Sequence, residues 1–432
     1  MTAAPLKLGI AGLGTVGVGV LKLIDQHGSD LTEKAGRPIV VTAVSARDRS
    51  RDRGVALDGY RWHDDAVALA HDADVDVVVE LIGGSDGVAK TLCLDAAANG
   101  KSIVTANKAL LALHGAAIAE AVEAGGVAIG FEAAVAGGIP IVKALREGLA
   151  GNAISRVYGI LNGTCNYILT EMRETGRDFD DVLQEAQALG YAEADPGFDI
   201  DGVDAAHKLA ILTSLAFATP IDFDAVHVEG IRHVTSLDIA YAGELGYSIK
   251  LLALAEQTAG GIEQRVHPAL VPLDAPIAHV EGVFNAVVAD GDFVDRTVFQ
   301  GRGAGAGPTA SAVVADLVDI AAGRRVPTFG RPVANLVSKP KVAMDAHVGR
   351  YYVRLMVYDR PGVIADVSAV LRDENISIGS MLQRGRSKDS AVPVILITHD
   401  AKEASICRAM SEIGGLKTAL EPPRFIRIQE FT

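Results

Sequence analysis

A glycine-rich turn near the N-terminus places the strongest constraint on how this chain can fold. An apolar stretch typical of a short buried strand, Leu6–Ala11, runs directly into Gly-Leu-Gly-Thr-Val-Gly at residues 12–17. Apolar residues then recur at helical spacing, at Val16, Val20, Leu23 and Ile24. Between a strand and a helix, Gly12, Gly14 and Gly17 let the backbone approach a pyrophosphate at the helix N-terminus. The turn therefore predicts a dinucleotide site, and a ligand-free glycine-rich turn is the alternative.

Strands and helices alternate through the first third of the chain, which indicates an α/β fold with a parallel sheet. The later predicted strands are Ile39–Ser45, residues 75–82, Ser102–Thr105 and residues 127–131, with helices at 90–98 and 109–124. The run at 75–82 is apolar except for Asp76 and Glu80, which suits a central parallel strand. We expect a Rossmann-type dinucleotide-binding domain at residues 1–135, completed by about 303–325.

Residues after two of these strands bear on the cofactor. NAD-binding folds often end the second strand with an acid that binds the ribose 2′-hydroxyl, but this chain has Arg47 and then Asp48. Arg47 can pair with a 2′-phosphate and favours NADP, whereas Asp48 leaves NAD open and a surface role for Arg47 is the alternative. Gly83 and Gly84 let the loop after residues 75–82 lie close to the cofactor.

Two lysines are candidates for an active site. Lys108 follows a strand at the sheet edge where open α/β sheets bind ligands, although it is also simply a residue at a helix start. In the acidic stretch 191–208, YAEADPGFDIDGVDAAHK, a helix predicted from Gly202 puts Asp204 and Lys208 on its buried stripe. A desolvated lysine beside a carboxylate can give or take a proton. A solvated ion pair on an amphipathic helix is the alternative.

The middle of the chain contains two loops of small residues and a predicted mixed sheet. Residues 131–140 (FEAAVAGGIP) precede a helix predicted from Pro140 and either coordinate a monovalent cation through carbonyl groups or form a tight hinge. Residues 300–309 (QGRGAGAGPT) open a helix predicted at 310–321 and either present amides to a ligand or only connect elements. Strands are predicted at 154–161, 251–255, 264–271 and 284–287, with a helix cap at residues 162–164. We assign residues 136–302 to a second domain, for which the resemblance described below implies a catalytic and dimerisation role.

The C-terminal part is predicted to be a separate small unit. Residues 326–348 have no clear periodicity and indicate a linker. Residues 349–432 then show strand, helix, strand, strand, helix and strand, which is the ferredoxin-like βαββαβ order. The predicted elements are residues 351–359, Val363–Asp373, residues 376–384, Ala391–Thr398, residues 401–413 and residues 416–428. Gly362 and Asn375 could line a small-ligand pocket there.

Composition narrows the class of protein. The 432 residues carry a net charge of −14, which argues against a nucleic-acid partner. No long uncharged apolar run and no leader segment are recognised, so we expect no membrane partner. The three cysteines, Cys93, Cys165 and Cys407, are scattered without disulfide or metal spacing, and we expect a cytoplasmic protein.

Taken in order, the motifs resemble those of homoserine dehydrogenase with a C-terminal ACT regulatory domain. The matching stretches are residues 12–17, 105–108, 131–140, 161–164, 190–208 and 301–309, continued by Asp-Arg-Pro-Gly at 359–362. The acidic run is the specific part of the resemblance, since the dinucleotide turn occurs in many families. The resemblance implies NAD(P)H-dependent, reversible reduction of L-aspartate 4-semialdehyde to L-homoserine, on the route to threonine, methionine and isoleucine.

The resemblance also implies roles for individual residues. Lys208 matches the proton donor, Asp204 the acid that positions it and the substrate, and Lys108 the second active-site lysine. Glu193, with Asp199 and Asp204, matches the carboxylates that hold the substrate ammonium group. Thr15, Val16, Gly84, Gly190 and Gly305 match cofactor contacts. Gly12, Gly14, Gly17, Arg47 and Lys108 are further candidates for cofactor binding, although the resemblance does not decide between NADP and NAD at Arg47 and Asp48. Glu132, Val135, Gly137 and Ile139 match a sodium site made mainly of main-chain oxygens.

The sequence also leads to expectations about the oligomeric state and the effector, and it leaves two other functions open. A homodimer or homotetramer and a threonine effector at the ACT domain are implied by the resemblance. Two other hypotheses stay open at this point. One is another NAD(P)-dependent amino-acid oxidoreductase, and the other is a small-molecule sensor with an inactive dehydrogenase body.

Overall fold

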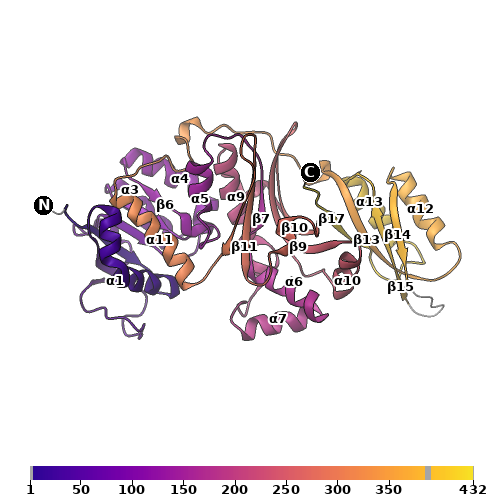
Figure 1. Cartoon of the computed structure of the whole chain (residues 1–432), viewed down its shortest axis with the longest axis horizontal. Coiled ribbons are helices and arrows are strands. Elements are labelled where there is room, and N and C mark those ends of the chain that lie inside the picture. Colours follow the sequence, from indigo (N-terminus) through magenta and orange to yellow (C-terminus); the bar gives the residue numbers. More distant parts are fainter. Residues whose placement is uncertain (1–2, 385–390, 432) are drawn as a thin grey trace.

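The computed structural model describes residues 3–384 and 391–431. The molecule is elongated, with the N-terminal α/β part, a middle part and the C-terminal part following one another along its long axis (Figure 1). The C-terminus lies back against the middle part instead of at the far end (Figure 1). Within those residues, no helix is long and apolar enough to cross a membrane.

The N-terminal part is a parallel sheet between helices, as predicted. In the described part of the chain this sheet has six strands in the order β3-β2-β1-β4-β5-β6, and every neighbouring pair is parallel. The strands are β1 (Leu6–Ala11), β2 (Ile39–Ser45), β3 (Arg61–His63), β4 (Val77–Glu80), β5 (Ser102–Thr105) and β6 (Ile129–Gly130). The helices are α1 (Thr15–Ala35), α2 (Ala68–His71), α3 (Val88–Ala98) and α4 (Lys108–Gly125). Because β1 and β4 are buried on both faces, their apolar runs are continuous instead of alternating.

A helix from much later in the chain joins this part. Helix α11 (Ala306–Ala321) packs beside α1, and a Cβ on Gly19 of α1 would lie only 2.9 Å from the Ala306 carbonyl oxygen. Figure 1 shows the two helices side by side, in colours that mark their distance in sequence. The prediction began this helix at residue 310, but the glycine-rich sequence before Thr309 is already helical.

The middle part is built on a mixed sheet that continues into the C-terminal part. Over the described residues the sheet has eleven strands, nine of them in the order β12-β11-β7-β9-β10-β17-β13-β15-β14, with β8 beside β10 and β16 beside β13. The strands of the middle part are β7 (Ile154–Ile160), β8 (Val226–Val228), β9 (Tyr247–Thr258), β10 (Gly261–Pro272), β11 (Phe284–Gly291) and β12 (Asp295–Arg302). Sequence reasoning missed β8 and β12; β12 is an edge strand that alternates between exposed and half-buried residues.

Helices of the middle part cover this sheet. They are α5 (Ile141–Lys143), continued by a π-helical turn (Ala144–Gly148), then α6 (Gly163–Thr175), α7 (Phe179–Ala188), α8 (Gly197–Ile200), α9 (Val203–Phe217) and α10 (Ser236–Glu244). Helix α9 is the central one, since it packs against α4 of the N-terminal part and against β7 and β9. Its sequence, VDAAHKLAILTSLAF, is apolar nearly all round, as expected for a helix enclosed on every side.

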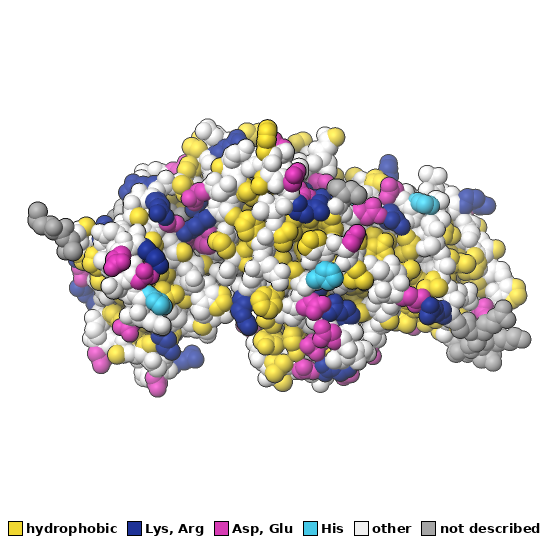
Figure 2. Space-filling view, viewed as in Figure 1, with side chains coloured by type: hydrophobic (Ala, Val, Ile, Leu, Met, Phe, Trp, Pro, Cys, Tyr) yellow, Lys and Arg dark blue, Asp and Glu magenta, His cyan; other side chains and the backbone are white. Residues whose placement is uncertain are grey.

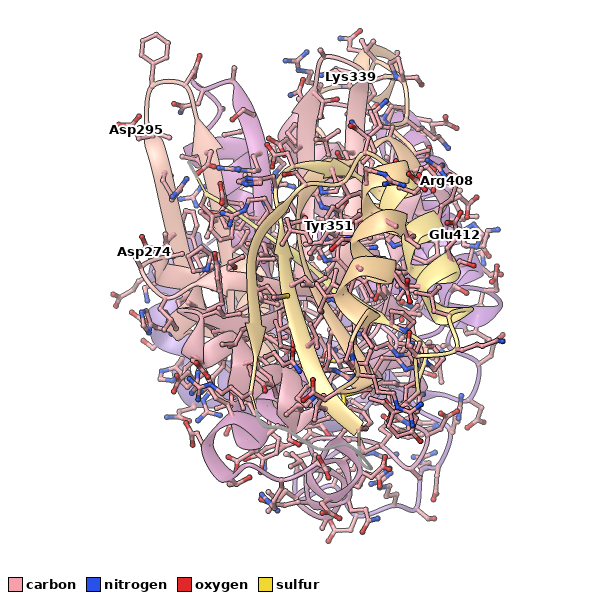
Figure 3. The ribbon with its side chains drawn as sticks, turned by 90° about the vertical axis from the view of Figure 1, so that its right-hand side faces the viewer. Asp274, Asp295, Lys339, Tyr351, Arg408 and Glu412 are labelled. Atoms are coloured by element: carbon pink, nitrogen blue, oxygen red, sulfur yellow. The ribbon has the colours of Figure 1, made fainter. Side chains whose placement is uncertain are left out.

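The C-terminal part has the predicted βαββαβ order, with one further strand of two residues, β16. Its elements are β13 (Val348–Tyr358), α12 (Val363–Asp373), β14 (Ile378–Gln383), β15 (Ala391–Thr398), β16 (Ala401–Lys402), α13 (Glu403–Gly414) and β17 (Arg424–Ile428). Seen end-on in Figure 3, Tyr351 lies between the strands and the helices, while Arg408 and Glu412 point outward from α13. The last strand was predicted over residues 416–428 but occupies only the final five of them.

The middle and C-terminal parts are joined because β17 pairs with strands of both. It is antiparallel to β13 and parallel to β10, with Ala269 opposite Arg427 and Leu270 opposite Ile428. The predicted linker is also tied to the middle part, since Val337 N–H donates to the Ala218 carbonyl at 3.1 Å and Ile262 N–H donates to the Pro340 carbonyl at 2.8 Å. The C-terminal unit is therefore fastened to the middle part through backbone hydrogen bonds.

Candidate active site

Helix α9 carries an aspartate and a lysine in a buried position. Asp204 is in the first turn and Lys208 one turn later, and only 4% and 8% of their surfaces are exposed. Sequence reasoning placed both residues on one buried stripe, whereas nearly the whole helix circumference is buried. A solvated pair on an amphipathic helix is therefore ruled out.

The Asp204 carboxylate is the centre of a cluster that joins three elements. Its Oδ2 atom accepts hydrogen bonds from Lys208 Nζ at 2.7 Å and from Asn162 Nδ2 at 2.8 Å. Its Oδ1 atom lies 3.0 Å from Lys108 Nζ, which comes from the start of α4. Lys208 Nζ also donates to the Leu161 carbonyl at 2.7 Å. Two lysines far apart in sequence thus share one carboxylate.

The pKa values of the two lysines are shifted in opposite directions. Burial lowers the pKa of Lys208 below its ordinary value, and the nearby ammonium of Lys108 adds to this effect although Asp204 opposes it. Lys108 is about one-third exposed, and the charge of Asp204 raises its pKa. Burial acts against the charge of Asp204, but the charges of the two ammonium groups and the hydrogen bonds from Lys208 and Asn162 hold its pKa below the ordinary value. Lys208 is therefore the lysine whose proton is more easily moved.

A second carboxylate, Asp199, lies beside this cluster. Asp199 Oδ1 accepts from Asn162 Nδ2 at 2.8 Å, and burial together with the charge of Asp204 raises the pKa of Asp199. Asn162 was predicted only as part of a helix cap; it is indeed the N-cap of α6, and its tie to both acids had no separate sequence signal. Glu193 is exposed, and within the described residues no hydrogen bond to its carboxylate is found, although its charge also raises the pKa of Lys108.

The loop after β4 is fixed next to Lys108. The carboxylate of Glu80, which is fully buried, accepts N–H groups of its own loop and, at 2.6 Å, the hydroxyl of Thr105 at the end of β5. Asn107 caps α4 and donates its Nδ2 to the Gly84 carbonyl at 2.6 Å. These contacts bring Gly84 to the same edge of the sheet as Lys108, where ligands of parallel sheets bind.

The glycine-rich turn has the shape that a pyrophosphate needs. Gly12 has a φ of 101°, and a Cβ there would lie 2.5 Å from the Leu81 carbonyl oxygen. A Cβ on Gly17 would lie 2.1 Å from the Gly12 carbonyl oxygen, whereas a Cβ on Gly14 would meet nothing within 4 Å. Gly14 is the N-cap of α1 without a side-chain cap, and Thr15 and Val16 begin the helix. Its first N–H groups can therefore bind an anion.

Several arginines follow strand β2 in the chain. Arg47 is exposed after β2, while the Asp48 carboxylate accepts the N–H and the hydroxyl of Ser50 at 2.8 and 2.6 Å. The guanidinium groups of Arg49 and Arg53 lie 5.7 and 5.9 Å from the Trp62 ring centre. Asp48 is thus occupied within its own turn, and the positive charges of three arginines lie near it in the chain.

The two loops of small residues lie against each other. Gly137 N–H donates to the Gly303 carbonyl at 2.9 Å, and Gly138 N–H donates to the Arg302 carbonyl at 2.9 Å. The side chain of Glu132 is buried, and its oxygens accept the N–H groups of Val142 and Lys143 at 2.8 and 2.9 Å.

Other members of the predicted sodium and cofactor sets lie in or near these loops. Val135, Gly137 and Ile139 are buried in the first loop. Gly305, with a φ of 118°, is the N-cap of α11, and Gly190, with a φ of 75°, follows α7. In the part of the chain that the structure describes, no group of three or more His, Cys, Asp or Glu side chains could hold a metal ion.

Comparisons with known proteins match one family along nearly the whole chain. A family model described as "Homoserine dehydrogenase, NAD binding domain" matches residues 12–132, "Homoserine dehydrogenase" matches 140–318 and "ACT domain" matches 351–413. The homoserine dehydrogenase of Pseudomonas aeruginosa is 46% identical over 435 residues, covering 99% of each chain. That of Neisseria gonorrhoeae is 46% identical over 431 residues, covering 98% of this chain and 99% of its own.

Solved structures agree with the sequence comparison. A homoserine dehydrogenase from Thiobacillus denitrificans has a TM-score of 0.93 at 46% identity, with 99% of both chains covered. A hyperthermophilic archaeal homoserine dehydrogenase in complex with NADPH has a TM-score of 0.64 at 26% identity, covering 77% of this chain and 100% of its own. The similarity therefore extends over the N-terminal, middle and C-terminal parts.

Proposed function

Because this chain belongs to the homoserine dehydrogenase family, we propose that its buried lysine–aspartate cluster performs the proton and charge steps of that reaction. The enzyme is an oxidoreductase that interconverts L-aspartate 4-semialdehyde and L-homoserine with a nicotinamide cofactor. Its C-terminal ACT domain is of a kind that binds amino-acid effectors. The family assignment disfavours both a dehydrogenase of different substrate and an inactive sensor.

Lys208 is proposed as the proton donor to the substrate oxygen. A nicotinamide cofactor supplies the hydride when bound, and negative charge then develops on the aldehyde oxygen. A desolvated ammonium stabilises that charge and can deliver its proton. The burial of Lys208 and its 2.7 Å bond to Asp204 support this role, because the aspartate orients the amine while burial makes its proton easier to release. Lys108, shared by the same carboxylate, is proposed as the second cation.

The acidic residues are proposed to hold the amino end of the substrate. Asp199 and Asp204 form a negative region next to the lysines, and the exposed Glu193 is available to approach an ammonium group. An ammonium bound there would be stabilised because the charges are partly shielded from water.

The experiment that tests the proposal is steady-state oxidation of L-homoserine, followed by the absorbance of the reduced cofactor. We expect Lys208→Ala to lower kcat by about 10³-fold, within the range for removal of a general acid. Lys250, another lysine that is almost fully buried but lies outside the cluster, provides a matched control through Lys250→Met. Near-parental turnover of Lys208→Ala would remove this lysine from the mechanism.

We propose NADP as the preferred cofactor. The exposed Arg47, with Arg49 and Arg53 nearby, supports recognition of a 2′-phosphate, and Asp48 is engaged with Ser50. The archaeal relative that binds NADPH adds support from the family. Kinetics with both cofactors test this proposal: Arg47→Ala should raise the KM for NADP and leave the KM for NAD nearly unchanged. Equal effects on both would contradict it.

A sodium ion at the 131–140 loop remains a proposal from the family resemblance. Its support is the buried turn of Val135, Gly137 and Ile139, whose main-chain oxygens are hard ligands suited to such a cation. Glu132 would contribute mainly through its main chain, because both side-chain oxygens already accept backbone N–H groups. Replacing sodium by choline in the assay buffer should lower activity, and an unchanged rate would exclude a functional ion.

Threonine is proposed as the effector of the ACT domain. The support is the family resemblance and the attachment of this domain to the middle part through β17 and β13. We expect threonine to lower kcat/KM for homoserine and to raise the melting temperature. If saturating threonine changes neither quantity, another amino acid or a purely structural role replaces this proposal.

We further propose a homodimer or homotetramer in the cytoplasm. Figure 2 shows hydrophobic side chains gathered over the middle of one face. The β11–β12 hairpin, near whose tip Asp295 is labelled in Figure 3, adds exposed Phe293, Val294 and Val298. Apolar surface of this kind supports an interface. Light scattering of the purified protein tests the assembly, and a monomeric mass would contradict it; cell fractionation tests the location.

A further inference from the structure

Asn162 occupies a position between the two buried acids of the candidate site. One amide, Nδ2, donates to Asp199 Oδ1 at 2.8 Å and to Asp204 Oδ2 at 2.8 Å, which uses both of its hydrogens. Its oxygen accepts the N–H of Cys165 at 2.8 Å as the N-cap of α6. Because the cap requires the oxygen on that side, the amide can face the acids only with its donor group.

The two acids need such a donor because they repel each other. Asp204 has the ammonium groups of Lys208 and Lys108, whereas the side chains that bind the Asp199 carboxylate are Asn162 and, at 3.3 Å, the hydroxyl of Thr164. The charge of Asp204 disfavours a second charge on Asp199, and the hydrogen bond from Asn162 favours it. In the described residues Asn162 is the side chain that donates to both carboxylates.

We propose that Asn162 is a positioning residue, which holds Asp199 and Asp204 side by side as two ionised carboxylates. Asp199 is then left free to bind the ammonium group of the substrate, while Asp204 binds the two lysines. A neutral amide suits this task, since a third cation would compete with the substrate and a third acid would increase the repulsion. This inference rests on the proposed function, because it assumes that the cluster around Lys208 is the reaction site.

Substitutions at Asn162 separate positioning from simple helix capping. Serine remains a good N-cap, so Asn162→Ser should keep the melting temperature close to that of the parent. Asn162→Ser removes the shared donor, and we expect the KM for L-homoserine to rise about tenfold with a smaller change in kcat. The acidic limb of the kcat/KM profile should move to higher pH, because Asp199 then takes up a proton more readily.

Asn162→Asp sharpens the test. It retains a cap but places a third carboxylate against the other two, so the loss of kcat/KM should exceed that of Asn162→Ser. If both variants keep the parental KM and pH profile, the inference is overturned and Asn162 is only a cap. Asn162→Ala is expected to lose stability because it lacks a cap. If Asn162→Ser then has both the stability and the pH profile of the parent, capping alone explains the role of Asn162 and the inference is overturned.

The outcome can be distinguished from failure of the proposed function. If Lys208→Ala were nearly fully active, the assignment of the site would fail whatever the Asn162 variants did. If Lys208→Ala is inactive while the Asn162 variants behave like the parent, the proposed function stands and only the role of Asn162 is lost.

Discussion

Asp204 in the candidate site and Asp238 at the attachment of the ACT domain are both buried aspartates that bind several partners. Their partners differ, and so do the roles that we expect for them. Asp204 is 4% exposed in the first turn of α9, and Asp238 is 1% exposed in the first turn of α10. Each carboxylate divides its two oxygens between partners from different parts of the chain. In Asp238, Oδ1 accepts from Arg354 Nε at 2.7 Å and from the Tyr352 hydroxyl at 3.0 Å.

The other oxygen of Asp238 belongs to its own helix. Oδ2 accepts the N–H and hydroxyl of Thr235, at 3.1 and 2.6 Å, in a capping box. Asp238 therefore fixes α10 of the middle part to β13 of the C-terminal part. In contrast, Asp204 uses both oxygens on side chains of the site: Lys108 on one, and Lys208 and Asn162 on the other.

The difference lies in the cations. Lysine can lose its proton when burial lowers its pKa, as for Lys208, whereas an arginine guanidinium keeps its charge in proteins. We expect Asp204, which is held by lysines, to take part in the chemistry, and Asp238, which is held by an arginine, to fix structure. The following predictions test this comparison.

The largest effect is expected for Asp204→Asn. Both lysines lose the negative charge that orients them, so kcat for homoserine oxidation should fall by about 10³-fold. The free energy of unfolding should fall less than after Asp238→Asn, because Lys108 is about one-third exposed and a buried lysine, unlike an arginine, can release its proton. Initial rates and urea unfolding measure the two quantities. A large loss of stability with a nearly normal rate would reverse the assignment.

Asp238→Asn should show the opposite pattern. An arginine does not release its proton in proteins, so breaking the buried Asp238–Arg354 pair should cost about 3 kcal/mol of unfolding free energy. At low temperature kcat should stay within about twofold of the parent, because the partners of Asp238 lie outside the site cluster. Thermal unfolding and initial rates check both points. A loss of activity without loss of stability would show that the contact between α10 and β13 acts directly on catalysis.

Lys250 is a buried lysine whose ammonium group binds neutral oxygen atoms instead of a carboxylate, so it shows what burial alone does to a lysine. Its Nζ donates to the Val280 carbonyl at 2.6 Å, and burial lowers its pKa to about 8. Below that pH it is protonated in the folded and unfolded states, and the folded state bears the full cost of the charge. Lys250→Met should therefore stabilise the protein by about 2 kcal/mol at pH 7, after allowance for the lost hydrogen bond.

The pH dependence of this effect has a definite sign. The unfolded protein binds more protons between about pH 8 and 10.5, so the Lys250 contribution to parental stability rises with pH in that window. The advantage of Lys250→Met should shrink there, as measured by unfolding at several pH values. A constant difference at all pH values would mean that packing, and not charge, causes the change.

The smallest effect is expected for Tyr352→Phe. Removing the hydroxyl takes one hydrogen bond from Asp238 Oδ1, which still accepts from Arg354. The loss should be about 1 kcal/mol of unfolding free energy, with no change in kcat. Comparing the melting temperatures of Tyr352→Phe and Asp238→Asn shows how much of the contact between α10 and β13 depends on the tyrosine hydroxyl and how much on the ion pair with Arg354. A loss as large as that of Asp238→Asn would mean that the hydroxyl is essential to the pair.

Much of the fold follows from local patterns, and part of it does not. The strands β1, β2, β5 and β15 and the helix α12 were predicted at the bounds that they have, because apolar runs and turn residues delimit them. Edge strand β12 and the short β17 were missed or mispredicted. Strand β17 pairs with strands far away in sequence, whereas β12 pairs with the preceding β11 but is an exposed edge strand, for which alternation alone is a weak signal.

The candidate site shows the same division. Asp204 and Lys208 are one helical turn apart, so their proximity and burial could be inferred from periodicity alone. Lys108 could be placed at a sheet edge but not beside Asp204, because that contact joins residues 96 positions apart through the packing of α4 on α9. Glu193 was expected to act with the cluster, and its exposed position leaves that role as a proposal.

By itself the sequence determined the dinucleotide turn, the order of elements and the lysine–acid pair on α9, since each depends on residues within a few turns of one another. Only the tertiary structure decided that Lys108 and Asn162 converge on Asp204, and that β17 joins the ACT domain to β10. The reason is physical. Helical and strand periodicities act over a few residues, whereas desolvation and shared hydrogen bonds arise only when distant segments exclude water together.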